Sequence, residues 1–145
     1  MKASFRYDAR LDPPGPVLPL RLAPPGAEHG VVFTVLVDTG ADCTLVPERT
    51  AHALGLPAID QVWIEELGGA ARRATVCAAR VEFAGVRLLA RVVAHGVEAI
   101  LGRDLLNHAI ALFDGPALRL SVRRPNSLPL RSKGKARNPG RCAQP

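Results

Sequence analysis

Short apolar runs separated by turn residues recur along this chain, and they predict strands rather than long helices. The longest run, Val31 to Val37, holds only β-branched and apolar residues, which is typical of a strand buried on both faces. Pro19 places the preceding run, residues 17–22, at a sheet edge, antiparallel to Val31–Val37. Further strands are expected at 4–8, 61–67, 71–79, 81–83, 86–93, 99–101, 110–113 and 118–122, and short helices at 48–57 and 103–108. The pattern predicts an all-β barrel or sandwich with two short helices.

A polar turn interrupts this pattern directly after the longest run. Asp38, Thr39 and Gly40 follow Val37, and a second β-type run, residues 43–46, leads to Pro47. Such a turn has a simple interpretation, in which Asp38 and Thr39 bond their own backbone and Gly40 adopts a positive φ. A carboxylate between two buried strands is nevertheless costly if it serves packing alone. The tripeptide by itself does not decide between a turn and a site.

Charge divides the chain into two parts. The net charge of +6 includes seven basic residues and no acid in residues 123–145, which leaves twelve basic residues against thirteen acids, or −1, in residues 1–122. A segment rich in Lys, Arg, Pro and Gly with few core-forming residues is expected to be disordered. We therefore expect one folded domain over residues 1–122 and a basic, disordered tail over residues 123–145.

Composition also restricts the classes of function that the chain can have and the cellular compartment in which we expect it. No apolar run approaches the roughly 20 residues of a membrane-spanning helix, and the N-terminus lacks the apolar core of a signal peptide. Cys43, Cys77 and Cys142 form no C-x-x-C pair and have no metal-ligand spacing with the four histidines. We expect reduced thiols, a cytoplasmic location, and no metal ion or other cofactor.

A second motif gives the polar turn its meaning. Residues 99–106 read A-I-L-G-R-D-L-L, about sixty residues after Asp38, and a Gly68-Gly69 hairpin tip lies between the two motifs. This ordered set resembles the retropepsin-like (clan AA) aspartic proteases, of the single-domain bacterial or retroviral type. Members of that family combine a D-[TS]-G turn, a flap hairpin and an I-[IL]-G-R-[ND]-x-L segment in this order. The resemblance covers residues 17–122.

The resemblance implies a closed six-stranded acid-protease barrel with a flap hairpin over residues 61–79. It also implies roles for individual residues. The catalytic residues would be Asp38, Thr39 and Gly40; the substrate-binding residues would be Ala41, Asp42, Leu67, Gly68, Gly69 and Ile100; Arg103 would support the structure. Asp42 and Arg103 would form an ion pair, or alternatively remain two independent surface charges. Leu45, Ile64, Leu67 and Ile100 would either line substrate pockets or belong to the ordinary core.

The chemistry of this family requires two carboxylates, and the chain holds one in the right setting. No second D-[TS]-G is present, since Asp114-Gly115 lacks the hydroxyl residue. Two neighbouring carboxylates share a proton, so that one activates water while the other bonds the scissile carbonyl. We therefore predict an aspartic endopeptidase that acts on peptide substrates as a homodimer with a second copy of Asp38. Residues 118–122 are the best sequence-level guess for the dimer contact.

Two other functions remain open at this point. The chain could be an inactive retropepsin-like module that binds peptides or dimerises, although such a module has no need of an intact Asp38-Thr39-Gly40. The basic tail could bind nucleic acid or an anionic surface through its charge, but it has no aromatic platform and no folded motif.

Overall fold

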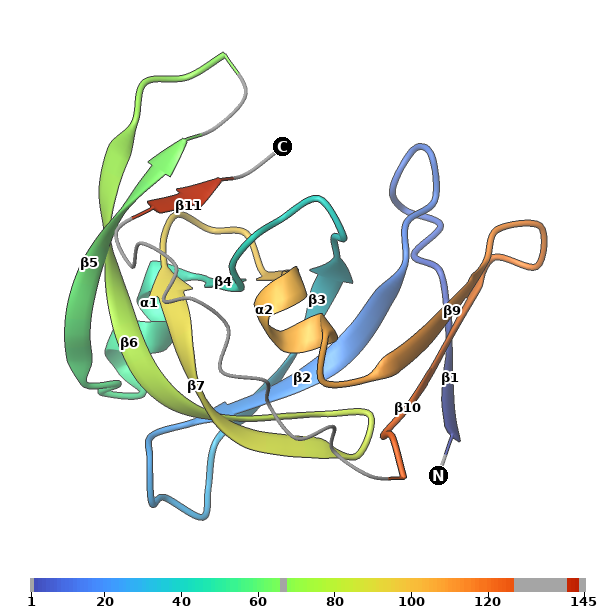
Figure 1. The fold of residues 1–145 in the computed structure, drawn as a ribbon, viewed down its shortest axis with the longest axis horizontal. Coiled ribbons are helices and arrows are strands. Elements are labelled where there is room, and N and C mark those ends of the chain that lie inside the picture. Colours follow the sequence, from blue (N-terminus) through green and yellow to red (C-terminus); the bar gives the residue numbers. More distant parts are fainter. Residues whose placement is uncertain (1, 66–67, 127–140, 144–145) are drawn as a thin grey trace.

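The computed structural model describes residues 2–65, 68–126 and 141–143. Strands dominate it, as the sequence pattern predicts (Figure 1). The elements in chain order are β1 (Lys2–Arg6), β2 (Val17–Ala23), β3 (Val31–Val37), β4 (Leu45–Val46), α1 (Glu48–Ala53), β5 (Ala58–Glu65), β6 (Arg72–Phe83), β7 (Val86–Ala94), β8 (Ile100–Leu101), α2 (Arg103–Leu106), β9 (Ile110–Asp114), β10 (Arg119–Arg123) and β11 (Arg141–Ala143).

Six of the strands close into a ring, in the order β6–β2–β3–β8–β4–β7, because β7 also pairs with β6. The β2–β3 and β6–β7 pairs are antiparallel hairpins, whereas β8 runs parallel to β3 and β4 runs parallel to β7. β5 lies outside the ring, antiparallel to β6. The predicted closed six-stranded barrel, the hairpins and the two short helices are thus confirmed.

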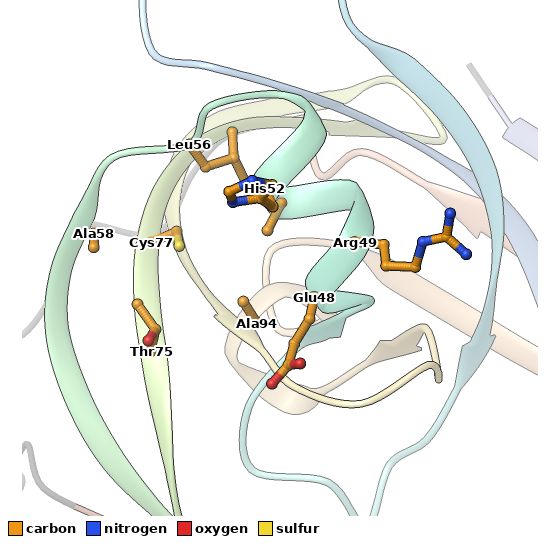
Figure 2. Close-up of a pocket in the computed structure, with 9 residues that line it drawn as sticks. Glu48, Arg49, His52, Leu56, Ala58, Thr75, Cys77 and Ala94 are labelled. Carbon is orange, nitrogen blue, oxygen red and sulfur yellow. The ribbon is translucent and has the colours of Figure 1, made fainter.

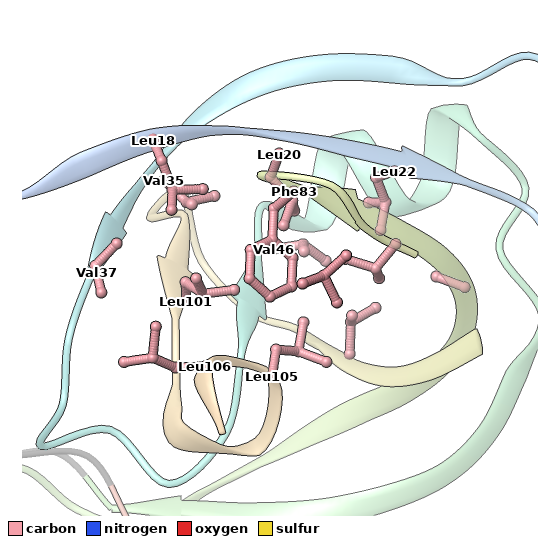
Figure 3. Close-up of a cluster of buried hydrophobic side chains, with 14 of the residues drawn as sticks. Leu18, Leu20, Leu22, Val35, Val37, Val46, Phe83, Leu101, Leu105 and Leu106 are labelled. Carbon is pink, nitrogen blue, oxygen red and sulfur yellow. The ribbon is translucent and has the colours of Figure 1, made fainter. Parts of the chain in front are cut away.

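The barrel is filled by one large apolar cluster (Figure 3). Leu18, Leu20 and Leu22 alternate along β2 with exposed residues and are almost completely buried, as a strand with one face on the core requires. Leu105 and Leu106 of α2 reach the same cluster. The short helix α2 is therefore anchored to the barrel by its own apolar side chains. This anchoring also positions the loop after Asp38, which contacts α2.

Two details of the early hairpin differ from the prediction. Val31 and Val32 are 40% and 54% exposed, because β8 pairs only with Leu36 and Val37 at the far end of β3. The expectation that β3 is buried on both faces is wrong for its first half. β2 is not an edge strand as a whole, since its residues 21–23 pair with β6. Pro19 lies before that pairing begins, where no neighbouring strand needs its missing N–H.

A second, three-stranded sheet has the order β1–β10–β9. β10 is its central strand, so both of its edges are paired within the chain. The guess that residues 118–122 form the dimer contact therefore does not fit strand addition at β10. Among residues 2–65, 68–126 and 141–143, nothing pairs with the outer edges of this sheet, which belong to β1 and β9.

The composition of the basic tail predicts no strand there, yet Arg141–Ala143 forms β11, parallel to β5. The expectation of disorder therefore does not hold for these three residues. Their local sequence has no strand pattern, and the pairing comes from the open edge that β5 offers. In the part of the chain that the structure describes, no helix is long and apolar enough to cross a membrane.

Candidate active site

Asp38 follows β3 at the point where β3 lies beside β8. Leu36 and Val37 pair in parallel with Ile100 and Leu101, and the Asp38 N–H donates a hydrogen bond to the Leu101 carbonyl at 3.1 Å. The two motifs singled out in the sequence are therefore neighbouring strand ends. The pairing of β3 with β8 therefore fixes the position of the Asp38 carboxyl group.

The turn itself is tight and polar. The Gly40 N–H donates to Asp38 Oδ1 at 2.8 Å, and the Ala41 N–H donates to the Asp38 carbonyl at 3.2 Å. These are the local bonds expected of a simple turn. Within a single chain Asp38 is only half-buried, and Thr39 and Gly40 are exposed.

Arg103 ties the loop that follows this turn to α2. Its backbone N–H donates to the Ala41 carbonyl at 2.9 Å, and its guanidinium donates to the Thr39 carbonyl at 2.8 Å. The same guanidinium forms an ion pair with Asp42. The predicted pairing of Asp42 with Arg103 is present, and Arg103 additionally holds two backbone carbonyls of the loop.

A second set of contacts between the same segments was not predicted. Thr44 is completely buried; its hydroxyl donates to Asp104 Oδ1 at 2.8 Å, and its N–H donates to Oδ2 at 3.0 Å. The Thr44 hydroxyl also accepts the Gly102 N–H at 3.1 Å. Burial of the carboxyl raises the pKa of Asp104, against the opposing effect of the bonds from Thr44, although the residue as a whole keeps exposed surface.

Gly102 is required here by the close approach of two backbones. A Cβ at this position would lie 2.5 Å from the Cys43 carbonyl oxygen and 2.6 Å from its carbon. No side chain fits at those distances, and the backbone it would meet is already tied down by Thr44 and Arg103. The loop of residues 38–44 is called the active-site loop from here on. The glycine in the second motif, Gly102, therefore allows this loop to lie against the end of β8.

The hairpin predicted as a flap is formed by β5 and β6. Gly68 and Gly69 are exposed near its tip, and Gly68 has a φ of +72° with no atom near its missing Cβ. Leu67, also predicted to bind substrate, lies outside the described residues. The only tryptophan, Trp63, is half-exposed, and the Arg73 guanidinium lies 5.9 Å from its ring centroid, so this side chain packs on the hairpin.

Comparison with known proteins identifies the family in which this arrangement occurs. A family model described as aspartyl protease matches residues 25–105, which include both motifs and the hairpin. The chain belongs to the aspartyl protease family. Among solved structures, EIAV protease complexed with the inhibitor HBY-793 is similar, with 20% sequence identity and a TM-score of 0.49 over 64% of this chain and 86% of that one. A search of curated proteins finds no match.

Membership of this family confirms the predicted resemblance to aspartic proteases and places the chain among hydrolases. Asp38, Thr39 and Gly40 lie inside the matched residues, as do Ala41, Asp42 and Ile100. Their individual roles in catalysis and substrate binding remain predictions. Among the described residues, no group of three or more His, Cys, Asp or Glu side chains could hold a metal ion.

An apolar cluster separate from the barrel core lies between the active-site loop and the hairpin. Its members are Ala41, Cys43, Leu45, Val62, Ile64, Ala74, Val76, Val93 and Ile100. Of the residues predicted to be either pocket walls or core, Leu45, Ile64 and Ile100 are buried in this cluster. Within the described residues, their burial matches the interpretation that they belong to an ordinary core.

A pocket of about 360 Å³ lies against this cluster and shares Cys43, Val62, Val76 and Val93 with it. Its lining includes Asp42 and Cys43 from the active-site loop, Val62 and Val76 from the hairpin, and Asp104. Cys142 of β11 also lines it and packs against the apolar cluster. No sequence signal linked Cys43 and Cys142, which are about a hundred residues apart.

A different pocket, of about 470 Å³, lies between α1 and strands β5, β6 and β7 (Figure 2). Thr75 and Cys77 line it from β6, and burial raises the pKa of the Cys77 thiol. Because side chains alternate along a strand, these two residues point to the opposite face of β6 from Val76. This pocket is therefore on the other side of the hairpin from the active-site loop, and we assign no substrate to it.

Proposed function

We propose that this chain is an aspartic endopeptidase that is active as a homodimer, with a protease domain over residues 1–122. The observation that carries the proposal is the Asp38 carboxyl, held at a strand end on an exposed turn that belongs to the family's motif. Because the sequence contains one such acid, a second copy of Asp38 completes the site across a two-fold axis.

The reaction follows from the electrostatics of such a pair. Two carboxyls about 3 Å apart, the separation known for aspartic proteases as a class, cannot both ionise. The ionised member takes a proton from water, and the protonated member donates a hydrogen bond to the scissile carbonyl. The Gly40 N–H, which already bonds Asp38 Oδ1, supports the ionised member. The resulting activity is biased to acid pH and is lost when the second carboxyl ionises.

The exposed turn and the terminal sheet supply the surface for the second copy. Thr39 and Gly40 are open to solvent in one chain, where the family's threonine would bond the other copy across the axis. β9 has a free edge and exposes Ile110, Leu112 and Phe113, at 45%, 60% and 38%. Apolar side chains gathered on one strand are typical of an interface, and we propose β9 as part of the dimer contact.

The substrate would lie extended between the turn and the β5–β6 hairpin. The hairpin acts as the flap: it closes over the bound peptide, excludes water and offers backbone hydrogen bonds from Gly68 and Gly69. Of the described residues predicted to bind substrate beside the turn, Asp42 lines the pocket next to the loop, whereas Ala41 and Ile100 are buried in the apolar cluster. Arg103 contacts no substrate and holds the loop in place through Thr39 and Asp42.

Digestion of a peptide library across a range of pH, with wild type and Asp38→Asn, tests the proposal. The variant keeps the size of the side chain but cannot act as the base, so we expect cleavage to fall by about 10²- to 10⁴-fold or more. A mass measurement on both proteins should show the same dimer. Undiminished turnover by the variant, or an active monomer, would contradict the mechanism.

A further inference from the structure

The outer edge of the flap hairpin is occupied by the chain's own C-terminal segment. β5 pairs with β6 on one edge and with β11 on the other, where Arg141, Cys142 and Ala143 lie opposite Trp63, Ile64 and Glu65. Figure 1 shows β11 lying beside β5. Adding a strand to an open sheet edge is a general way in which extended peptides bind proteins.

The side chain at the centre of this segment enters the pocket beside the active site. Cys142 is half-buried and packs on the apolar cluster that holds Cys43, Val62 and Ile64. The Cys142 and Cys43 thiols hydrogen-bond each other, and this contact lowers the pKa of Cys142. Cys43 follows Asp38 by five residues in the same loop. The segment therefore bridges the flap hairpin and the active-site loop.

The chemistry of the pocket defines what it accepts. Its floor consists of small aliphatic side chains, which include Val62, Val76 and Val93, and its rim carries charges of both signs, from Asp42, Asp104 and Arg91. A small apolar or thiol side chain fits this floor. A carboxylate placed on the floor would lose its water against an apolar surface, which is unfavourable.

We propose that the open edge of β5 and the pocket that holds Cys142 form a strand-binding groove for the substrate, and that the C-terminal segment 141–143 occupies this groove as an intramolecular competitor. The groove accepts an extended peptide with a small apolar or thiol side chain beside Cys43. The inference rests on the proposed function, because that function identifies the ligand that the tail displaces as the substrate. The basic tail thereby gains a role that requires no nucleic acid.

Peptide binding to the full-length chain tests this competition. The probe is a fluorescent synthetic peptide with the sequence of residues 138–145, N-P-G-R-C-A-Q-P, under reducing conditions, and binding is followed by fluorescence anisotropy. The protein carries Asp38→Asn so that the probe stays intact, and it is compared with and without Cys142→Glu. The added carboxylate should expel the tail from the groove. We expect the peptide to bind about tenfold more tightly to the Cys142→Glu chain, because the fraction of free grooves rises.

Two controls fix the interpretation. Asn126→Glu adds one negative charge to the same tail at an exposed position outside the pocket, and it should leave the peptide affinity unchanged. A probe with glutamate in place of its cysteine should bind neither chain. Equal dissociation constants for the two chains, absence of binding to the Cys142→Glu chain, or equal binding of the glutamate probe would each overturn the proposal.

The binding experiment is independent of turnover, so the two proposals fail separately. If the wild-type dimer cleaves no peptide at any pH, the endopeptidase proposal fails. The anisotropy measurement still shows whether the tail occupies the groove. If the enzyme cleaves peptides and its KM is the same with Cys142→Glu as with the wild-type tail, only the competition proposal fails. The expected result with active enzyme is a KM about tenfold lower in the Cys142→Glu chain.

Discussion

The active-site loop and the flap hairpin form two sides of one pocket, yet they are held by different kinds of interaction. The loop is bound to the β8–α2 segment by side-chain hydrogen bonds between residues 58 to 64 positions apart. On the hairpin, Val62, Ile64 and Val76 pack in the apolar cluster, and the outer edge of β5 pairs through its backbone with β11. We therefore expect the hydrogen-bonded loop to be the more rigid side of the pocket, and the hairpin to open at a lower cost in free energy.

The largest effect is expected where the loop approaches β8 most closely. Gly102→Ala places a Cβ against the Cys43 backbone, which Thr44 and Arg103 prevent from moving away. We expect the free energy of unfolding to fall by about 3 kcal/mol, together with a loss of activity because Asp38 shifts with the loop. Chemical denaturation and peptide cleavage measure the two effects. Wild-type stability in this variant would show that the loop is not rigid.

Removal of the buried Thr44 hydroxyl tests the same loop with a smaller perturbation than Gly102→Ala. Thr44→Val leaves the Gly102 N–H without its acceptor and takes one donor from Asp104. The expected loss of unfolding free energy is about 2 kcal/mol. Thr44→Ser is the matched control, since it keeps the hydroxyl and loses only a methyl group. If the two variants are equally stable by chemical denaturation, the hydrogen bonds do not hold the loop.

The pH dependence of stability reports on Asp104. Its pKa is raised in the folded protein by burial, so the native state binds more protons than the unfolded state and stability falls as pH rises through the folded pKa. Asp104→Asn should remove this part of the slope between the ordinary value of 3.8 and the raised value. Denaturation curves at a series of acidic pH values measure it, and an unchanged slope would contradict the assignment.

The smallest effect on stability is expected in the hairpin. Gly68→Ala introduces a side chain at a φ of +72° with free space around it, so the cost is the backbone strain of about 1 kcal/mol. Gly85→Ala is the matched control, with a φ of +81° and free space at the β6–β7 turn. Both should lose similar stability by denaturation.

Only Gly68→Ala should change the kinetics, because its turn belongs to the hairpin that we propose as the flap. We expect a higher KM or a lower kcat in peptide cleavage for this variant alone. Equal kinetics for the two alanine variants would remove the hairpin tip from the proposed function.

Local pattern was sufficient for most of the fold. Strand alternation and turn glycines predicted the hairpins, and the resemblance to aspartic proteases implied the contact between Asp42 and Arg103. Local pattern failed where a strand's surroundings decide burial, as for Val31 and Val32. It also failed for β11, since the three residues 141–143 carry no strand signal and are ordered by the free edge of β5.

The sequence alone determined which functional groups the chain carries and the family to which it belongs. Asp38-Thr39-Gly40, the second motif and the absence of a second acid turn are readable from residue types and their order, because each residue type carries its own functional group. Tertiary structure decided which of these groups meet. It brought Thr44 to Asp104, Gly102 to the Cys43 backbone and Cys142 to Cys43, since contacts between distant segments depend on how the barrel closes and not on local preference.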